Sequence, residues 1–387
     1  MNFKRPIYLD YMATTPVDPR VAEKMSHYLT QEGVFGNPAS VSHYYGWEAA
    51  EAIHTARVQV AHLLQADERE IVWTSGATEA NNLALKGVAN FYSRNGKHII
   101  TSSIEHKSVL DVCCYLESKG FEVTYLAPNA QGLISVEDFV SAIRPQTILA
   151  SIQYVNSEIG TIQPIQALAE VARNKGVLFH CDAVQAASTI FLNIEDLKVD
   201  LLSLSAHKIY GPKGIGCLYV RRQPRVRLEP LLHGGGHEYG LRSGTLATHQ
   251  IVGFGEACHL IQSQQRQEID RLKTLRDKLW YGLQAVGGVS LNGGAEHRAA
   301  NNLNVSFDGV DGEALLLSLR EIAVSSGSAC TAVSMEPSYV LTAIGLSKQQ
   351  AQQAIRFGLG RFTTEEEIEY AIHHVTTQVQ QLRNLAP

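Results

Sequence analysis

A lysine that follows a run of apolar residues is the side chain of this sequence best suited to covalent chemistry. Lys208 stands in the segment Ser205–Gly214, Ser-Ala-His-Lys-Ile-Tyr-Gly-Pro-Lys-Gly, directly after the strand-like run Val199–Ser205. A lysine that leaves a strand beside small and polar residues can be desolvated. Its pKa then falls from ~10.4 towards the ~7–8 that a Schiff-base amine needs. Lys208 is therefore a candidate Schiff-base lysine.

A carboxylate occurs at the end of an earlier strand-like run. Asp182 lies in Val177–Gln185, Val-Leu-Phe-His-Cys-Asp-Ala-Val-Gln. A carboxylate at the end of a parallel strand, beside such a lysine, is the partner that a pyridinium nitrogen requires. Taken singly, a lysine after a strand is usually solvated and an aspartate there usually caps the next helix. Together the two segments favour pyridoxal phosphate as the cofactor.

A third segment is suited to bind a phosphate group. Ile71–Glu79, Ile-Val-Trp-Thr-Ser-Gly-Ala-Thr-Glu, predicts a strand, a tight turn and the start of a helix. The unpaired N–H groups of such a helix start, with the hydroxyls of Ser75 and Thr78, would form an anion cradle. Ordinary helix capping explains the same residue types. Ser205 and His207, which flank Lys208, could donate to the same phosphate.

A glycine-rich segment, Leu231–Gly240 followed by Arg242–Thr245, predicts a loop that can approach a ligand closely. Its His-Gly-Gly-Gly run resembles the oxyanion loop of a hydrolase, but no Gly-x-Ser-x-Gly motif occurs in the chain. His233 and His237 could ligate a metal, yet no spaced cysteines or acids accompany them. No Gly-x-Gly-x-x-Gly motif opens a helix after a strand, so a nicotinamide cofactor has no support.

The segment Val324–Ala332, Val-Ser-Ser-Gly-Ser-Ala-Cys-Thr-Ala, has no side chain larger than valine. Such a stretch packs poorly and predicts a mobile loop, with the thiol of Cys330 as its reactive atom. The five other cysteines lie in helical or strand patterns, where a small buried hydrophobe is the better interpretation. Cys330 is therefore the candidate nucleophile or carrier.

Two further residues suit a substrate site. Arg356, in the run Ala354–Arg361, is predicted on a short strand and could bind a carboxylate through two hydrogen bonds. The spacing does not choose between Arg356 and Arg361. His106 follows the predicted strand His98–Thr101, at the carboxyl end where open sheets place ligands, although a histidine there is often a helix cap.

Composition places the chain among ordinary globular enzymes. It has 387 residues, 45% of them hydrophobic and 18% charged, with a formal net charge of −5. The charge and the lack of a basic tract argue against nucleic acid. Neither a signal-peptide core nor the ~18 apolar residues of a membrane span occurs. The six cysteines are scattered, which predicts reduced thiols and a cytoplasmic protein.

The pattern of elements predicts an α/β fold. Strand-like runs alternate with helical patterns from about residue 70 to 220, which favours a mainly parallel, seven-stranded sheet flanked by helices. The runs are Ile71–Trp73, His98–Thr101, Phe121–Tyr125, Ile148–Ile152, Val177–Phe179, Leu201–Leu204 and Gly216–Val220. A polar helix from Ser263 and shorter strands around Leu303–Phe307 and Arg356–Leu359 predict a smaller α+β domain. We expect residues 16–262 to form the large domain, and residues 1–15 with 263–387 to form the small one.

With these residues in view, the chain resembles the cysteine desulfurases of the housekeeping iron–sulfur assembly type. Those proteins belong to the fold-type I pyridoxal phosphate enzymes, near the class V aminotransferases. Four motifs occur in the family's order: Thr-Ser-Gly-Ala-Thr-Glu, His-Lys-Ile-Tyr-Gly-Pro-Lys-Gly, Arg-Ser-Gly-Thr and Ser-Ser-Gly-Ser-Ala-Cys-Thr. The resemblance runs from Pro6 to the final helix, which opens with the capping box Thr364–Glu367.

The resemblance implies a role for each motif residue. Lys208 would form the Schiff base and move the substrate's α-proton, His106 would stack on the ring and assist, and Cys330 would take the sulfur. The cofactor would be held by residues around its ring and phosphate: Ala77, Thr78, Ser157, Asp182, Gln185, Ser205 and His207. The substrate would be bound by Arg356 and Asn156. Thr245 would reach the phosphate of a neighbouring subunit, which implies a homodimer.

The implied activity is L-cysteine desulfurization, giving alanine and a persulfide on Cys330. The sulfur would pass to acceptor proteins and an iron–sulfur scaffold protein, and would also serve tRNA thiolation. No resident metal is implied, only a transient ligation of a scaffold-bound cluster by Cys330. Two alternatives remain open: a selenocysteine lyase-type β-elimination and a non-catalytic regulatory paralogue.

Two positions depart from the family's pattern. The family usually has Val-Asn-Asn-Glu-Ile-Gly where this chain has Val155–Gly160, Val-Asn-Ser-Glu-Ile-Gly. Ser157 thus replaces an amide by a hydroxyl with fewer hydrogen bonds, which predicts a modest change in rate or cofactor colour. Bacterial members often continue past the last helix with a tail that helps dock the scaffold, whereas this sequence ends at Pro387. The strength of scaffold binding is therefore an open point.

Overall fold

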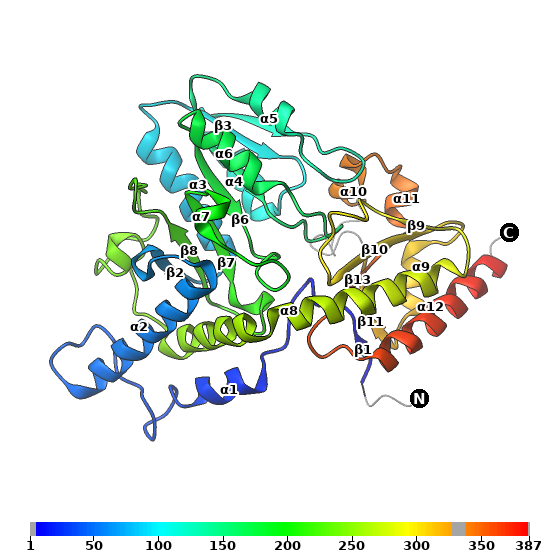
Figure 1. Cartoon of the computed structure of the whole chain (residues 1–387), viewed down its shortest axis with the longest axis horizontal. Helices are drawn as coiled ribbons and strands as arrows, with labels where there is room; N and C mark the ends of the chain where they lie inside the picture. The colour runs from blue at the N-terminus through cyan, green and yellow to red at the C-terminus, as the bar shows by residue number, and fades with distance from the viewer. Residues whose placement is uncertain (1–4, 327–336, 386–387) are drawn as a thin grey trace.

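The computed structural model describes residues 5–326 and 337–385 of the chain. Its largest element is a seven-stranded sheet in the order β2-β8-β7-β6-β5-β3-β4 (Figure 1). The strands are β2 (Ile71–Thr74), β3 (His98–Ser102), β4 (Glu122–Leu126), β5 (Thr147–Gln153), β6 (Leu178–Asp182), β7 (Leu201–Ser205) and β8 (Gly216–Val220). β8 pairs antiparallel with both neighbours and the other pairs are parallel. The predicted seven strands and mainly parallel sheet are confirmed.

Both faces of this sheet are covered by helices, because its strands are apolar on both sides. Neighbouring residues of a strand alternate between two cores: Val72 joins one, whereas Ile71 and Trp73 join the other. The first core is closed by α3 (Ala77–Tyr92) and α4 (Lys107–Glu117). The second is closed by α2 (Tyr44–Leu64), α5 (Val136–Ala142), α6 (Ile165–Asn174) and the start of α8 (Thr248–Gln284).

A second, smaller part is built around a four-stranded antiparallel sheet in the order β12-β13-β10-β9. Its strands are β9 (Val289–Leu291), β10 (Asn302–Phe307), β12 (Ser325–Ser326) and β13 (Ala354–Gly358). A separate apolar core joins it to α9 (Gly312–Ser318) and α12 (Glu365–Leu385). The helix α12 begins with the predicted capping box, since Thr364 and Glu367 exchange backbone-to-side-chain hydrogen bonds.

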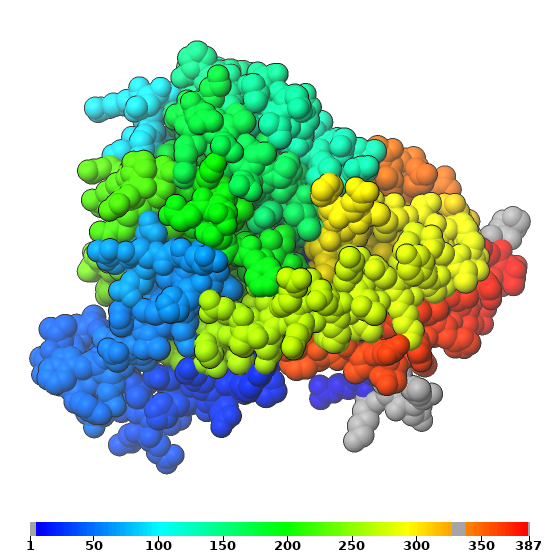
Figure 2. Space-filling model, in the orientation of Figure 1, coloured from blue at the N-terminus to red at the C-terminus, as the bar shows by residue number. Residues whose placement is uncertain are grey.

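The long helix α8 connects the two parts (Figures 1 and 2). Phe254 and Ile261 pack in the core of the large sheet, whereas Leu272 and Leu279 pack in the core of the small one. The expected boundary between residues 262 and 263 therefore falls inside a continuous helix. The separate polar helix expected from Ser263 is the second half of α8.

The amino-terminal residues pack on the smaller part. β1 (Ile7–Tyr8) pairs in parallel with β11 (Ile322–Ala323), and Ile7 and Leu9 lie in its core. One prediction needs correction here, because two residues of the expected loop Val324–Ala332 lie in a strand. Ser325 and Ser326 form β12, whose backbone pairs with Arg356 and Ile355 of β13.

The remaining elements are short segments that connect these layers. They are α1 (Pro19–Ser26), α7 (Ile194–Leu197), α10 (Tyr339–Ala343), α11 (Lys348–Gln352) and the 3-10 turns η1 (Glu68–Glu70), η2 (Ala206–Lys208) and η3 (Glu238–Gly240). Within the described ranges, no helix is both long and apolar enough to cross a membrane.

Candidate active site

A cavity of about 610 Å³ opens where the carboxyl ends of β5, β6 and β7 face β13 and the amino-terminal segment. Most of the residues predicted for the cofactor and substrate line it. These residues are Ala77, Thr78, His106, Ser157, Asp182, Gln185, Ser205, His207, Lys208 and Arg356. Segments far apart in the sequence thus meet in one place, at the edge of the parallel sheet where open α/β folds bind ligands.

The amine of Lys208 lies against the amino-terminal segment. It donates to the backbone carbonyls of Met12, at 2.5 Å, and Ala13, at 2.8 Å. The side-chain amide of Gln185 donates to the same Met12 oxygen at 2.9 Å. The ring of His207 contacts the Thr14 hydroxyl at 3.1 Å. Residues 12–14 are therefore part of the site, which sequence reasoning missed because their types carry no chemical signal.

A chain of hydrogen bonds joins the predicted ring residues. The Asn81 amide donates to Asp182 and to the Ser108 hydroxyl, both at 2.8 Å. Ser108 in turn contacts Nδ1 of His106 through its hydroxyl at 2.8 Å and its backbone N–H at 3.1 Å. Because Nδ1 accepts, a neutral His106 carries its proton on Nε2. Asn81 was missed, although an asparagine within the apolar pattern of α3 is a usable signal.

The turn before α3 has free donors for an anion. Its N-cap residue is Gly76, with φ of 152°, and it provides no side-chain hydrogen bond to the first N–H groups of the helix. That positive φ favours glycine. Ser75, Thr78 and Ser205 line the cavity at this end. Burial lowers the pKa of His207 to about 4, so its ring is neutral at pH 7.

The structure distinguishes Arg356 from Arg361, the two arginines between which the sequence could not choose a carboxylate ligand. Arg356 lines the cavity, donating to the Ser157 carbonyl at 3.0 Å and to Asp10 at 2.8 Å. Arg361 instead bridges Asp18, at 2.8 Å, and Glu268, at 3.2 Å, and is absent from the cavity lining. Arg361 thus ties the two parts of the molecule together, and Arg356 is the candidate carboxylate ligand.

Two predicted residues, Asn156 and Thr245, do not line this cavity, and a third cannot be placed. The Asn156 amide is used by its own turn, donating to the Ile104 carbonyl and accepting from the N–H groups of Glu158 and Ile159. It is buried and does not line the cavity, so the predicted substrate contact has no geometric support. Thr245 does not line the cavity of its own chain either. Cys330 lies outside the described residues.

Two buried acids lie beside the site, and sequence reasoning found neither. Burial raises the pKa of Glu105 to about 8, and the nearby Asp182 charge acts in the same direction. One oxygen of Glu105 accepts from Ser102 and the Gln153 N–H, while the other has no partner among the described residues. Burial likewise raises the pKa of Glu158 to about 7, against the opposing charges of Arg356 and His106. Burial therefore favours the protonated form of both carboxyls, and more strongly for Glu105.

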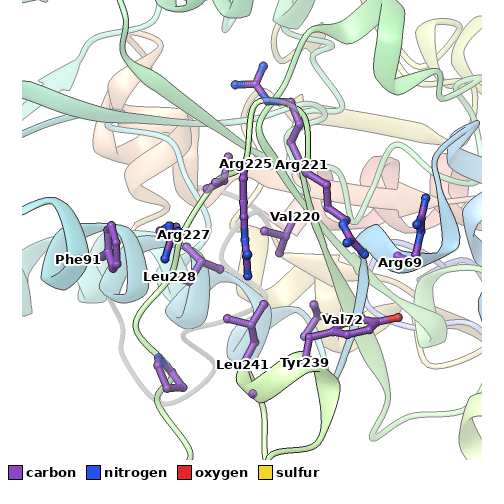
Figure 3. A pocket seen from close by; sticks show the side chains of 14 residues that line it. Arg69, Val72, Phe91, Val220, Arg221, Arg225, Arg227, Leu228, Tyr239 and Leu241 are labelled. Carbon is purple, nitrogen blue, oxygen red and sulfur yellow. The ribbon is translucent and has the colours of Figure 1, made fainter.

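A second pocket, of about 320 Å³, shares no lining residue with the first. Figure 3 shows Arg69, Arg221, Arg225 and Arg227 around it, together with Tyr239. Arg69 and Arg221 pair with Asp67 and Asp200. Arg225 and Arg227 form no ion pair within the described ranges, so this surface carries positive charge.

Comparison with known proteins defines the family. The model for aminotransferase class-V matches residues 7–371. The chain belongs to the class-V aminotransferase family. The curated cysteine desulfurase IscS of Proteus mirabilis (strain HI4320) is 60% identical over 99% of this chain and 95% of that protein. The cysteine desulfurase IscS of Shewanella sp. (strain ANA-3) is 58% identical over the same shares of each chain.

Solved structures of this family have the same fold. A structure described as a NifS-like protein has a TM-score of 0.91 at 38% identity, covering 97% of this chain and 100% of that one. A second, described as SspA in complex with cysteine, has a TM-score of 0.82 at 43% identity, with 92% and 100% coverage. The predicted resemblance to cysteine desulfurases is confirmed.

Enzymes of this family use pyridoxal phosphate, as the sequence predicted. The donors around the cavity fit that cofactor. The uncapped start of α3 suits its phosphate, a buried carboxylate at Asp182 suits its ring nitrogen, and Lys208 provides the amine. The apolar side chains of Val155 and Val184 line the space between these groups and suit a planar ring.

Proposed function

We propose that this protein removes sulfur from L-cysteine and holds it as a persulfide on Cys330. The observation that carries the proposal is that Lys208, Asp182 and Arg356 line one cavity beside an uncapped helix start. The relatives named cysteine desulfurase, at 58% and 60% identity over nearly the whole chain, support the same activity.

The proposed reaction balances without an added oxidant. The Cβ–S bond of cysteine breaks, the Cys330 thiolate forms an S–S bond to that sulfur, and the carbon fragment takes up a proton to leave as alanine. Pyridoxal phosphate, when bound, supplies the electron sink that makes the α-proton acidic and the sulfur labile. Arg356 would hold the substrate carboxylate, Lys208 would carry the α-proton, and His106 would exchange a proton through Nε2.

Four of the five described cysteines are poorly suited to carry the sulfur, and the fifth, Cys114, is exposed. Burial raises the pKa of the thiols of Cys113, Cys181, Cys217 and Cys258, so these thiols are poor nucleophiles at neutral pH. The strand β12, which ends shortly before Cys330 in the sequence, pairs with β13 at Arg356. The last described residues before Cys330 in the sequence therefore lie beside the residue that would hold the substrate.

A homodimer is part of the proposal. Thr245 follows the glycine-rich loop but does not line its own chain's cavity, which suits a role in a neighbouring subunit. The segment between α1 and α2 projects from the molecule (Figure 2) and, with the start of α2, carries apolar side chains that are more than half exposed. They are Phe35, Val41, Tyr44, Tyr45 and Trp47. Exposed apolar surface of this kind is typical of an interface.

Protein partners would receive the sulfur. We propose acceptor proteins and an iron–sulfur scaffold protein, with tRNA thiolation as one destination. The unpaired arginines of the second pocket offer a surface for an acidic partner. We also propose that residues 16–262 and the remaining segments act as two domains joined through α8.

The test is spectroscopic and chemical. The protein supplied with pyridoxal phosphate should absorb near ~400 nm, and borohydride should attach the cofactor to a peptide that contains Lys208. Given L-cysteine, the Cys330→Ala variant should keep the colour but form no protein-bound persulfide. Cys114→Ala, which removes an exposed cysteine, should behave as the wild type. A colourless protein, or persulfide on the Cys330→Ala variant, would contradict the proposal.

A further inference from the structure

The guanidinium of Arg356 already holds an anion. Its Nη2 lies 2.8 Å from a carboxylate oxygen of Asp10, and its Nη1 donates to the Ser157 carbonyl at 3.0 Å. The side chain of Arg356 is 3% exposed and that of Asp10 is 19% exposed. Nε of Arg356 is buried and has no partner within the described ranges. A guanidinium has five N–H groups and these two bonds use two of them, so Arg356, which lines the cavity, keeps donors for a ligand there.

The backbone of Asp10 is held in place by hydrogen bonds and by its bridge to β13. Its backbone forms a parallel bridge with Gly358, two residues after Arg356 on β13. Its carbonyl accepts from the Ala13 N–H at 2.9 Å and from the Tyr8 hydroxyl at 3.1 Å. Its neighbours Leu9 and Tyr11 are buried. The backbone of Asp10 is therefore held beside β13, which places its carboxylate within reach of Arg356.

The pair has an electrostatic consequence for substrate binding. Without Asp10, a guanidinium that is almost wholly buried would be left unpaired, which is costly. With Asp10 in place, a second carboxylate on Arg356 would lie beside a fixed like charge in a partly buried site, and like charges there weaken binding.

We propose that Asp10 is a positioning residue that holds Arg356 and sets the affinity of the site for the α-carboxylate of its amino-acid ligands. This inference rests on the proposed function and deepens it. Asp10 keeps the guanidinium oriented when no substrate is bound. When a ligand is bound, Asp10 competes with the ligand's carboxylate for the positive charge of Arg356. The carboxylate therefore binds less tightly than it would to an unpaired arginine, and the alanine product dissociates readily.

The test uses Asp10→Asn, since an asparagine oxygen can still accept from Nη2 but carries no charge. The probes are L-alanine and ethylamine, which differ by the carboxylate alone, and binding is followed by the visible absorption of the cofactor in the holoenzyme. We expect Asp10→Asn to bind L-alanine more tightly by about tenfold, the scale of one like-charge contact. Ethylamine should bind equally to both proteins. Asp10→Glu, which keeps the charge, should show no gain.

Two further measurements distinguish this change in L-alanine affinity from a general loss of folding or cofactor binding. In an Arg356→Gln background L-alanine should bind much more weakly, and adding the Asp10→Asn change should not restore the wild-type affinity, because the cation that binds the carboxylate is gone. Asp308→Asn removes an exposed carboxylate of the small part and should leave both probes unchanged. Unchanged or weaker L-alanine binding by Asp10→Asn would overturn the inference, as would an equal gain for ethylamine. If the wild type itself shows no absorption change with L-alanine, the proposed function fails instead.

Discussion

A buried ion pair between Glu238 and Arg57 fixes the glycine-rich loop, and we expect its removal to destabilise the large part of the molecule. Glu238, in η3, accepts from Nη2 of Arg57 at 2.8 Å, from Nη1 at 2.9 Å and from the Trp73 N–H at 2.8 Å. The side chains of Glu238 and Arg57 are 2% and 11% exposed. Trp73 lies on β2, directly before the turn that we assign to the phosphate. The pair therefore joins that strand to the loop that carries Thr245.

The backbone of this loop depends on the same contact. Glu238 and Tyr239 have φ of 51° and 57°, a left-handed backbone conformation that residues other than glycine rarely adopt. Each such residue costs about 1–3 kcal/mol, and it persists only where its surroundings enforce it. The three hydrogen bonds of the Glu238 carboxylate supply that enforcement.

Glu238→Gln should lower the free energy of unfolding by about 3–5 kcal/mol. The substitution preserves shape but removes the charge and turns an amide donor towards Arg57, which leaves a buried cation without its counter-ion. Urea unfolding followed by tryptophan fluorescence measures the loss. Amide hydrogen exchange in residues 231–245 should also become faster, because the left-handed backbone is no longer held.

The matched control is Glu365→Gln. Glu365 pairs with Lys278 at the surface, where both side chains are substantially exposed. An exposed pair of this kind contributes about 0–1 kcal/mol. If Glu238→Gln costs no more than Glu365→Gln, the buried pair does not hold the loop and the reasoning is wrong.

Three more outcomes are expected. Arg356→Ala should raise the KM for L-cysteine by at least about tenfold, whereas Arg361→Ala should lower the urea midpoint and leave KM within about twofold, because only Arg356 lines the cavity. The pKa of Glu105, about 8 when folded, exceeds its ordinary 4.5, so the folded protein keeps a proton that the unfolded chain releases. The free energy of unfolding should therefore fall as pH rises from about 5 through 8. Glu105→Gln should make that fall smaller in urea midpoints measured along the pH series, and the raised pKa of Glu158 should account for part of the remainder. Ser157→Asn should shift the cofactor's absorption maximum and change kcat by less than about tenfold, since one hydrogen bond is involved; an unaltered spectrum would show that residue 157 does not reach the ring.

Local sequence patterns were enough to predict the main helices and strands and the residues that stand out from their neighbours. Most strands of the large sheet were predicted because they are short and apolar on both faces. Lys208, Asp182 and the turn before α3 were found because each stands directly after such a strand, where its type is unusual. Both kinds of signal lie within a few neighbouring residues, so they do not depend on how distant segments pack.

The tertiary structure alone decided which distant residues share a charge or a hydrogen bond. Arg356 and Asp10 are 346 residues apart in the sequence, and nothing near either residue distinguishes Arg356 from Arg361. Asn156 has the expected type and place, but its amide is used by the turn that contains it. Glu105 holds a proton because the surrounding layers exclude water, which no local pattern records. Such properties follow from burial and from which segments meet, and these are fixed only when the two sheets, α8 and the amino-terminal segment pack together.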